Sequence, residues 1–261
     1  ASFTFNKNTI KEQAEAPQLY ANTASTGHCY GQAFGYVANG FFQKSDDLNG
    51  DGIISAAEMQ QNGYPVQSFT TVYPGDVKYV DLTGDKNIDA NDRKAIGYST
   101  TAPDIYYNFH LGAEYKGIGL DAMFQGVGRW TGFMTTNGLY RSAVATNTLS
   151  QYLYENSWSA ERGNTESALF PRLSTTSNAN NDLNSTLNMF DRSYIKLRYV
   201  ELYYHLPKSL LNKLSVINNI KLYVRGTDLF TADHLDKADA ASYGVAQPLT
   251  RSVQLGAALT F

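Results

Sequence analysis

Hydrophobic and polar residues alternate with a period of two along several segments of this chain. The last segment is the clearest. Val253, Leu255, Ala257, Leu259 and Phe261 share one face, and polar or small residues occupy the positions between them. Such alternation is typical of a β-strand with one apolar and one polar face. The pattern therefore predicts a strand over 252–261.

The same period predicts two hairpins. Segments 105–115 and 118–125 both alternate, and Lys116-Gly117 joins them in a tight turn. Segments 193–206 and 219–230 form the second pair, joined by a turn at 207–218. The phase slips around Tyr199–Glu201, which predicts a β-bulge. Phe3 and Phe5 indicate the tail of an earlier strand, so we expect about six strands.

Long polar stretches separate these strands at 9–103, 129–191 and 231–248, whereas the connections at 116–117 and 207–218 are short. Short turns at one end and long loops at the other are typical of outer-membrane barrels. Loops of this length are uncommon in compact domains unless they carry function. We expect them to contain few apolar residues around which to fold.

Composition narrows the class of protein. The net charge is only −3, so no broad basic surface favours nucleic acid. No apolar run approaches the ~20 residues of a membrane-spanning helix, which leaves a soluble protein or a β-barrel. The single cysteine excludes an intrachain disulfide and a cysteine metal cluster. No nucleophile turn of the G-x-S-x-G kind is present, so we expect no enzyme.

The segment 47–58 matches a twelve-residue calcium loop. Its predicted metal ligands are the side chains at positions 1, 3, 5 and 12 and the main-chain carbonyl at position 7: Asp47, Asn49, Asp51, Glu58 and Ile53. Gly52 stands at position 6, where the chain must turn sharply, and Ile54 at position 8 would be an apolar anchor. The alternative is a solvated Asp/Asn/Gly turn that binds no metal.

The segment 81–92 follows the same plan. Its predicted ligands are Asp81, Thr83, Asp85, Asn87, Asp89 and Asp92. Lys86 occupies position 6, where glycine would ease the turn, and Asp92 is shorter than the usual glutamate. We expect one or two structural Ca²⁺ ions to stiffen this region. A regulatory calcium switch needs a pair of flanking amphipathic helices, and the sequence after Glu58 breaks too soon for one.

Aromatic residues recur in the long polar stretches, namely Trp130, Phe133, Tyr140, Tyr152, Tyr154 and Trp158. Their rings could stack on sugars or pack the loops together, and we favour packing.

Pro74-Gly-Asp-Val-Lys-Tyr-Val-Asp-Leu-Thr-Gly-Asp leads into the second acidic loop. Further motifs along the chain are Phe170-Pro-Arg-Leu173, Ser193-Tyr-Ile-Lys-Leu-Arg198 and Leu222-Tyr-Val-Arg-Gly-Thr-Asp-Leu-Phe-Thr231. Together these segments resemble the C-terminal part of the SusC/RagA-type TonB-dependent outer-membrane transporters. The resemblance covers almost the whole chain, but the loop at 47–58 is not typical of the family.

The resemblance implies a nutrient importer in the bacterial outer membrane, a multi-pass barrel energised through TonB. A SusD-like surface lipoprotein would act as its lid, and oligosaccharides or peptides would be its substrates. Relative to that family, we expect the N-terminal plug domain and TonB-contact segment to be absent from this chain.

We therefore predict an all-β fold, the C-terminal part of a transmembrane antiparallel β-barrel, over residues 1–261. It comprises a loop region at 9–103 carrying both acidic loops, a hairpin at 104–128, a second extracellular loop at 129–191 and the last three strands at 192–261. About six strands cannot close a barrel, so further strands and lipid must surround them. Two alternatives remain: a calcium-binding surface adhesion or glycan-binding β module, and a passive porin.

Overall fold

The computed structural model describes residues 1–136, 139–141, 148–211, 216–235, 237–238, 240, 243 and 249–261. Within them the chain forms two compact units. The sheet unit comprises residues 1–7, 103–130 and 191–261, and the loop unit comprises residues 8–102 and 131–190. Long strands dominate the sheet unit, and nearly all strand pairs of the chain are antiparallel, which confirms the predicted all-β class.

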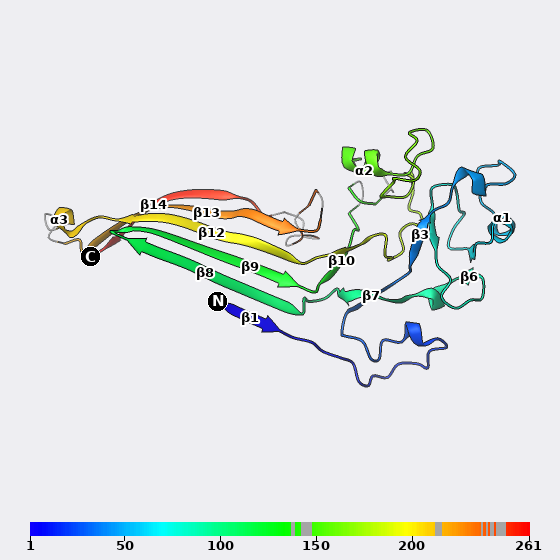
Figure 1. The fold of residues 1–261 in the computed structure, drawn as a ribbon, viewed down its shortest axis with the longest axis horizontal. Helices are drawn as coiled ribbons and strands as arrows, with labels where there is room; N and C mark the ends of the chain where they lie inside the picture. The colour runs from blue at the N-terminus through cyan, green and yellow to red at the C-terminus, as the bar shows by residue number, and fades with distance from the viewer. Residues whose placement is uncertain are drawn as a thin grey trace. The chain divides into compact units, whose positions relative to one another are not determined.

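The sheet unit contains one antiparallel sheet of six strands in the order β1-β8-β9-β12-β13-β14 (Figure 1). The strands are β1 Ser2–Phe5, β8 Ile105–Tyr115, β9 Ile118–Gly128, β12 Tyr194–His205, β13 Asn219–Asp233 and β14 Ser252–Thr260. Each predicted strand is present within a few residues of its predicted ends. The period-two pattern was therefore a sound guide to this sheet.

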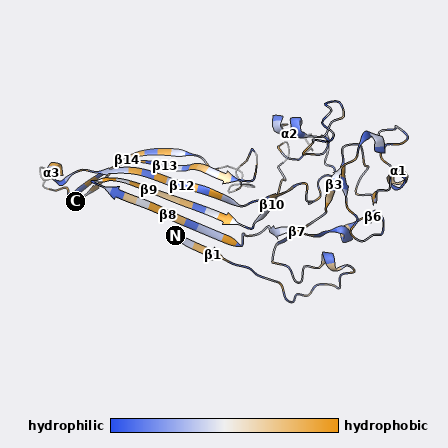
Figure 2. Cartoon of the chain, in the orientation of Figure 1, coloured by the Kyte–Doolittle hydropathy of each residue, from blue (hydrophilic) through white to orange (hydrophobic). Residues whose placement is uncertain are grey.

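The register aligns the apolar faces of neighbouring strands. Leu120 of β9 lies opposite Ala113 of β8 and Leu202 of β12. Leu202 lies opposite Val224 of β13, which in turn pairs with Leu255 of β14. Figure 2 shows hydrophobic and hydrophilic residues alternating along these strands. The result is a continuous apolar surface on one side of the sheet.

The connections are asymmetric, as the sequence predicts. Residues 116–117 join β8 to β9, and residues 206–218 join β12 to β13 through the short helix α3 (Lys208–Leu211). At the other end of the antiparallel sheet, residues 6–104, 129–193 and 234–251 make the links. Parts of the predicted connections 207–218 and 231–248 lie outside the described residues.

The predicted bulge is present and lies between Leu197 and Tyr199 of β12. Arg198 is the extra residue of β12 relative to β9. Opposite this position, β13 has one residue more than β12. There Asp228 has a left-handed φ of 53°. The Arg198 guanidinium contacts the Asp228 carboxylate at 2.8 Å, so an ion pair bridges the two irregularities. The shift keeps apolar residues on one face along the whole of β12.

Three glycines of the sheet lie directly opposite tyrosines. Gly119 pairs with Tyr203, and Gly256 pairs with Tyr223. A methyl group on Gly119 would lie 2.1 Å from Cζ of Tyr203, and one on Gly256 would lie 2.4 Å from Cζ of Tyr223. Gly126 has the same relation to Tyr107. Each tyrosine ring therefore packs directly on the backbone of the neighbouring strand, at a position where only glycine leaves room for it.

The loop unit is built from short elements. Its strands are β2 Gln32–Gly35, β3 Ala38–Phe41, β4 Val66–Gln67, β5 Val77–Tyr79, β6 Asn87–Ile88, β7 Lys94–Ser99, β10 Thr131–Phe133 and β11 Met189–Asp191. They pair as β2–β7, β3–β5, β4–β6 and β10–β11. The helices are α1 Ala56–Gln61 and α2 Gln151–Asn156. None of the helices in the described part of the chain has the length and apolar content needed to cross a membrane.

The expectation that this region has few apolar residues around which to fold is wrong. Six buried side chains, Tyr36, Phe41, Val77, Tyr79, Ile88 and Trp158, form one core cluster. A second cluster contains Phe42, Ile54, Met59 and Val72. Trp158 comes from the segment 131–190 and the other members from 8–102. The loop unit therefore has a hydrophobic core to which both of its segments contribute.

Candidate metal centre and the network around Asp76

The two acidic loops, 47–58 and 81–92, are closed by the same hydrogen bonds at position 1. Asp47 accepts N–H bonds from Gly50 and Gly52, both at 2.8 Å. Asp81 accepts them from Gly84 at 2.6 Å and from Lys86 at 2.8 Å. The donors are positions 4 and 6 in both loops. The position-1 carboxylate therefore organises the turn in each case.

The carboxylates at position 12 also play matching roles. Glu58 accepts N–H bonds from Leu48, Asn49 and Ser55 at 2.8, 3.1 and 2.8 Å. In the second loop, Asp92 accepts from the equivalent positions 2, 3 and 9, at 2.8, 3.2 and 2.8 Å. Glu58 and Asp92 are both buried. The shorter aspartate thus reaches the same three donors as the glutamate.

The structure explains how Lys86 replaces glycine at position 6. Lys86 has φ 65°, close to the φ of 84° at Gly52 in the first loop. A non-glycine residue in this left-handed region is strained by about 1 kcal/mol. The N–H bond that Lys86 donates to Asp81 requires that conformation. Lysine at this position therefore leaves the hydrogen-bonding pattern of the loop intact.

These bonds favour the ionised carboxylates. The hydroxyl of Ser55 and then its N–H, with further help from Asn49 and Leu48, lower the pKa of Glu58 to about 2. For Asp81, partial burial opposes ionisation, but the N–H groups of Gly84 and Lys86 outweigh it and the pKa is lowered. Both loops therefore present negative charge at neutral pH.

The remaining predicted ligands bond within their own loops. Asn49 and Asp51 accept the N–H groups of residues 51 and 53, and the Thr83 hydroxyl donates to Asp81. Asp85 and Asp89 accept the N–H groups of residues 87 and 91. In the described part of the chain, no three His, Cys, Asp or Glu side chains converge as a group that could hold a metal ion. The side-chain oxygens of both loops are ligands of the kind that suits a hard cation. Ion binding stays a prediction.

The apolar residue at position 8 is buried in both loops. Ile54 is 2% exposed and belongs to the cluster with Phe42 and Met59, as the sequence predicts. Ile88 is also 2% exposed and belongs to the cluster with Tyr79. The two isoleucines have different backbone partners: Ile54 donates its N–H to Val72, whereas Ile88 lies in β6, which pairs with β4. Each loop is therefore anchored to the core separately.

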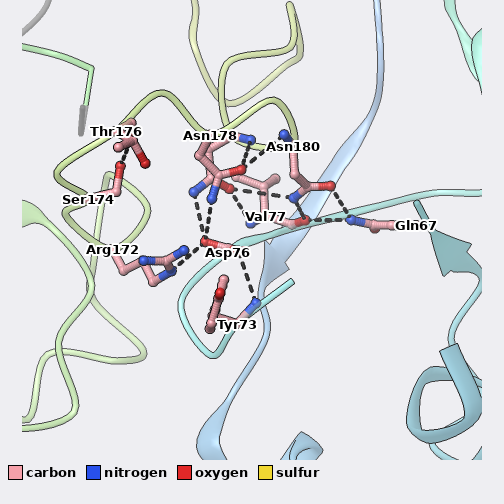
Figure 3. Close-up of polar contacts among 10 residues, drawn as sticks. Gln67, Tyr73, Asp76, Val77, Arg172, Ser174, Thr176, Asn178 and Asn180 are labelled. Atoms are coloured by element: carbon pink, nitrogen blue, oxygen red, sulfur yellow. Dashed lines mark hydrogen bonds and ion pairs between the residues drawn. The ribbon is translucent and has the colours of Figure 1, made fainter. Parts of the chain in front are cut away.

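Asp76 is a buried polar centre whose role sequence reasoning missed. Its carboxylate is fully buried and accepts hydrogen bonds from the side-chain amides of Asn178 and Asn181, at 3.1 and 2.9 Å, and from the N–H of Tyr73 at 3.0 Å. Arg172 contacts it at 2.7 Å (Figure 3). The contacts with Arg172, Asn178 and Asn181 connect the two segments of the loop unit, between residues about a hundred positions apart.

The neighbouring residues extend this network. Asn180 donates to the carbonyl of Val77 at 2.9 Å and accepts from Gln67 at 2.8 Å (Figure 3). Gly75 has φ 91°, and a methyl group there would lie 2.4 Å from the ring of Trp158. The Pro-Gly-Asp and Pro-Arg-Leu segments carried the family resemblance, but no spacing rule linked them to each other or to the asparagines.

The loop aromatics mostly pack, as predicted. Tyr140 and Trp158 are buried, and Tyr140, Tyr152 and Phe170 form a cluster of ring contacts at 5.7 to 6.4 Å between centroids. Tyr154 is 45% exposed, with the Arg162 guanidinium 4.3 Å from its ring centre.

Comparison with known proteins gives a consistent picture. No family model matches the chain. Over 251 residues, 91% of the chain, it is 25% identical to "TonB-dependent receptor P3" of Formosa agariphila, of which it covers 22%. Its fold resembles solved structures of the RagAB peptide transporter (TM-score 0.62, 20% identity, 94% of this chain) and of the RagAB peptide importer in the "open-open" state (TM-score 0.65, 20% identity, 99% of this chain).

The chain spans only about a quarter of those structures, 24% and 26% of their lengths, and about a fifth of the sequence relative. The relatives are receptors and transporters, in keeping with the expectation of no enzymatic activity. The sequence match is thus to a protein described as a TonB-dependent receptor, and the matched structures share the fold of this chain.

Proposed function

We propose that this chain is part of an outer-membrane, TonB-dependent nutrient importer. It contributes wall strands and the extracellular loops 9–103, 129–191 and 231–248. The observation that carries the proposal is the inverted polarity of the sheet unit, whose apolar face is exposed while charged side chains elsewhere in the sheet are buried. Water on the apolar face would be unfavourable, whereas hydrocarbon there stabilises it.

The exposed fractions make the inversion clear. Leu120, Leu202 and Leu255 are 51%, 53% and 82% exposed. Glu201 and Lys196 are only 2% and 1% exposed. Glu201 lies between Lys221 and Arg225, at 2.5 and 2.6 Å. Soluble monomers rarely expose a continuous apolar surface across several strands.

The sheet edges indicate missing strands. Among the described strands, β1 and β14 each pair with a single neighbour, so each has an edge of unpaired backbone groups. Such edges are strongly unfavourable in lipid, and about eight strands are needed for a filled barrel. We therefore expect the remainder of the barrel, and the plug that gates it, to come from outside this chain.

Transport by such a protein has no chemical step. The barrel wall supplies the conduit, the loops shape the substrate cavity, TonB supplies energy and a SusD-like lipoprotein acts as the lid. The structures that share this fold are those of a peptide transporter. For this chain we propose uptake of oligosaccharides or peptides.

Uptake measurements on the full-length protein test this function. We expect its substrate to enter cells only when TonB is intact, and the purified protein to require detergent. Substrate entry without TonB would instead identify a passive porin. A protein that stays monodisperse without detergent would identify the soluble adhesion or glycan-binding module, because that module must cover its apolar face with protein.

Calcium at the acidic loops is a second, separate proposal. The shared hydrogen-bonding pattern and the carboxylate, amide and hydroxyl oxygens of both loops support it, since hard cations prefer oxygen ligands. The carboxylate oxygens of Asp47 and Asp51 each accept one hydrogen bond and keep a second lone pair for a cation. The role proposed for the ion is structural.

Calorimetric titration of the full-length protein with CaCl₂ after chelation tests the calcium proposal. We expect saturable binding and a raised unfolding temperature, both reduced in Asp51→Ala. Glu166→Ala serves as the control, because Glu166 is exposed and lies outside both loops. If neither heat of binding nor a thermal shift is detected, the loops are hydrogen-bonded turns without a metal.

A further inference from the structure

Two pockets of the loop unit meet at Arg172. The basic pocket has a volume of about 310 Å³, and Lys44, Trp158, Arg162 and Arg172 line it. The hydroxyl pocket has a volume of about 410 Å³, and Arg172 also lines it. Leu173 borders both. Arg172 and Leu173 line both, so the two pockets are adjacent, and their sizes fit small-molecule sites.

The basic pocket carries excess positive charge. Lys44, Arg162 and Arg172 line it together with one acid, Glu161. Asp76 balances Arg172, and the remaining two cations still outnumber Glu161. Lys44 and Arg162 are both exposed to solvent. The pocket therefore favours an anionic group.

Arg162 is held in position before any ligand arrives. Its Nη2 donates to the carbonyl and hydroxyl oxygens of Ser157, at 2.8 and 3.0 Å. Its guanidinium lies 4.3 Å from the ring centre of Tyr154. A guanidinium has five N–H donors in a planar arrangement, so donors beyond Nη2 can bind a carboxylate or a sulfate.

Arg172 forms a fixed wall between the pockets. The buried Asp76 carboxylate contacts its Nε at 2.7 Å (Figure 3), and its guanidinium lies 4.4 Å from the ring centre of Tyr73. Only 24% of the Arg172 side chain is exposed. The Asp76 network thus holds this shared residue in one geometry, which lowers the entropy lost on binding.

The second pocket is lined mainly by hydroxyl groups. Six of its residues are serine or threonine: Thr70, Thr71, Ser174, Thr175, Thr176 and Ser177. Tyr73, which is 36% exposed, adds an aromatic ring. Hydroxyls both donate and accept, as the hydroxyls of a sugar do, and an aromatic face suits the apolar face of a sugar ring.

We propose that the two pockets together bind an anionic oligosaccharide, with its carboxylate or sulfate in the basic pocket and an adjoining sugar ring in the hydroxyl pocket. This inference rests on the proposed importer for its biological purpose, because it narrows the substrate from oligosaccharide or peptide to acidic sugars. The binding itself is independent of transport.

Calorimetric titration of the detergent-solubilised full-length protein tests the site. The probes are a galacturonic acid tetramer, a sulfated carrageenan tetrasaccharide, neutral maltotetraose and tetra-aspartate. We expect at least one anionic sugar to bind about tenfold more tightly than maltotetraose and tetra-aspartate, with affinity falling as salt rises. The carboxylated and sulfated probes distinguish the two anionic groups.

Two variants locate the binding. Lys44→Ala combined with Arg162→Ala should weaken the anionic sugar by about tenfold or more and leave maltotetraose unchanged. Thr175→Ala combined with Ser177→Ala should weaken both sugars. Lys94→Ala is the matched control, because Lys94 is an exposed lysine of the same unit that borders neither pocket.

Three results would overturn the site: no anionic sugar binds, tetra-aspartate binds as tightly as the sugars, or the double variant Lys44→Ala/Arg162→Ala binds normally. Failure of the importer has a different signature, namely intact sugar binding together with uptake that ignores TonB.

Discussion

The sheet unit and the loop unit place the same kinds of side chain in opposite environments. In the sheet unit, Leu255 is 82% exposed while Glu201 is 2% exposed. In the loop unit, apolar residues such as Phe42 and Val77 are fully buried. Under the proposed function, one chain contains a part suited to hydrocarbon and a part suited to water. The contrast shows that the exposed fraction of a side chain has to be interpreted together with the solvent that its surface contacts.

The largest effect should come from removing the polar centre of the loop unit. Asp76→Ala leaves Arg172, Asn178 and Asn181 without their shared acceptor. Losing one partner of a buried ion pair typically costs about 3–5 kcal/mol. Hydrogen exchange of the full-length protein should show loss of protection across 171–181, while strands β8 and β9 stay protected. Glu166→Ala, at an exposed position, is the control. Equal loss of protection in the sheet unit and the loop unit would contradict the proposed difference between them.

The next test asks which solvent meets the apolar face of the sheet. Leu255→Arg should destabilise the protein in lipid bilayers by about 2–4 kcal/mol, the usual effect of arginine facing hydrocarbon. Leu19 of the loop unit is 81% exposed, almost as much as Leu255. Leu19→Arg should change stability by no more than about 0.5 kcal/mol, because its surroundings are aqueous. Urea titrations of the protein folded into vesicles would measure the stability of both variants. Equal destabilisation by the two substitutions would contradict the proposed difference in solvent between the two sites.

A third test concerns packing within the sheet. Gly119→Ala forces a methyl group against the ring of Tyr203 and should cost about 1–3 kcal/mol through overpacking. Gly112→Ala is the matched control, because the nearest atom to its added methyl group is 3.8 Å away. The same urea titrations apply. A Gly119→Ala protein as stable as Gly112→Ala would mean that the tyrosine ring moves aside freely.

The smallest effect should appear in the pH dependence of the first acidic loop. The pKa of Glu58 is lowered to about 2 by its hydrogen bonds, so the ionised form stabilises the folded loop. That contribution is fully present above the unfolded-state pKa of about 4.3 and is lost as the pH falls towards 2. Glu58→Gln should flatten this part of the stability curve. Unfolding monitored between pH 5 and pH 2 would show an unchanged slope if the bonds were unimportant.

The sequence predicted the sheet unit better than the loop unit, for a physical reason. A strand of about ten residues with one apolar face has enough alternating positions for the period of two to be recognised in the sequence. The shift of phase near Tyr199 indicated the bulge. Strands of two to six residues produce none, so the core around Tyr79 and Trp158 was not foreseen. The acidic loops were recognised from local spacing alone.

The polar network shows the limit of local reasoning. Asp76 bonds to Asn178 and Asn181, which lie 102 and 105 positions further along the chain. No spacing rule spans such a distance, and asparagines in a polar stretch suggest only turns. By contrast, Asp81 and Lys86 form their bond within one turn of chain, and the loop motif identified both positions.

The bonds of Asp76 also constrain how such a protein can diversify. Segments 8–102 and 131–190 complete each other's interior through Asp76, Asn178, Asn181 and Trp158. Recombination that exchanged one segment alone would leave a buried acid without its amides and a tryptophan without its pocket. A change in one of these segments should therefore require a matching change in the other.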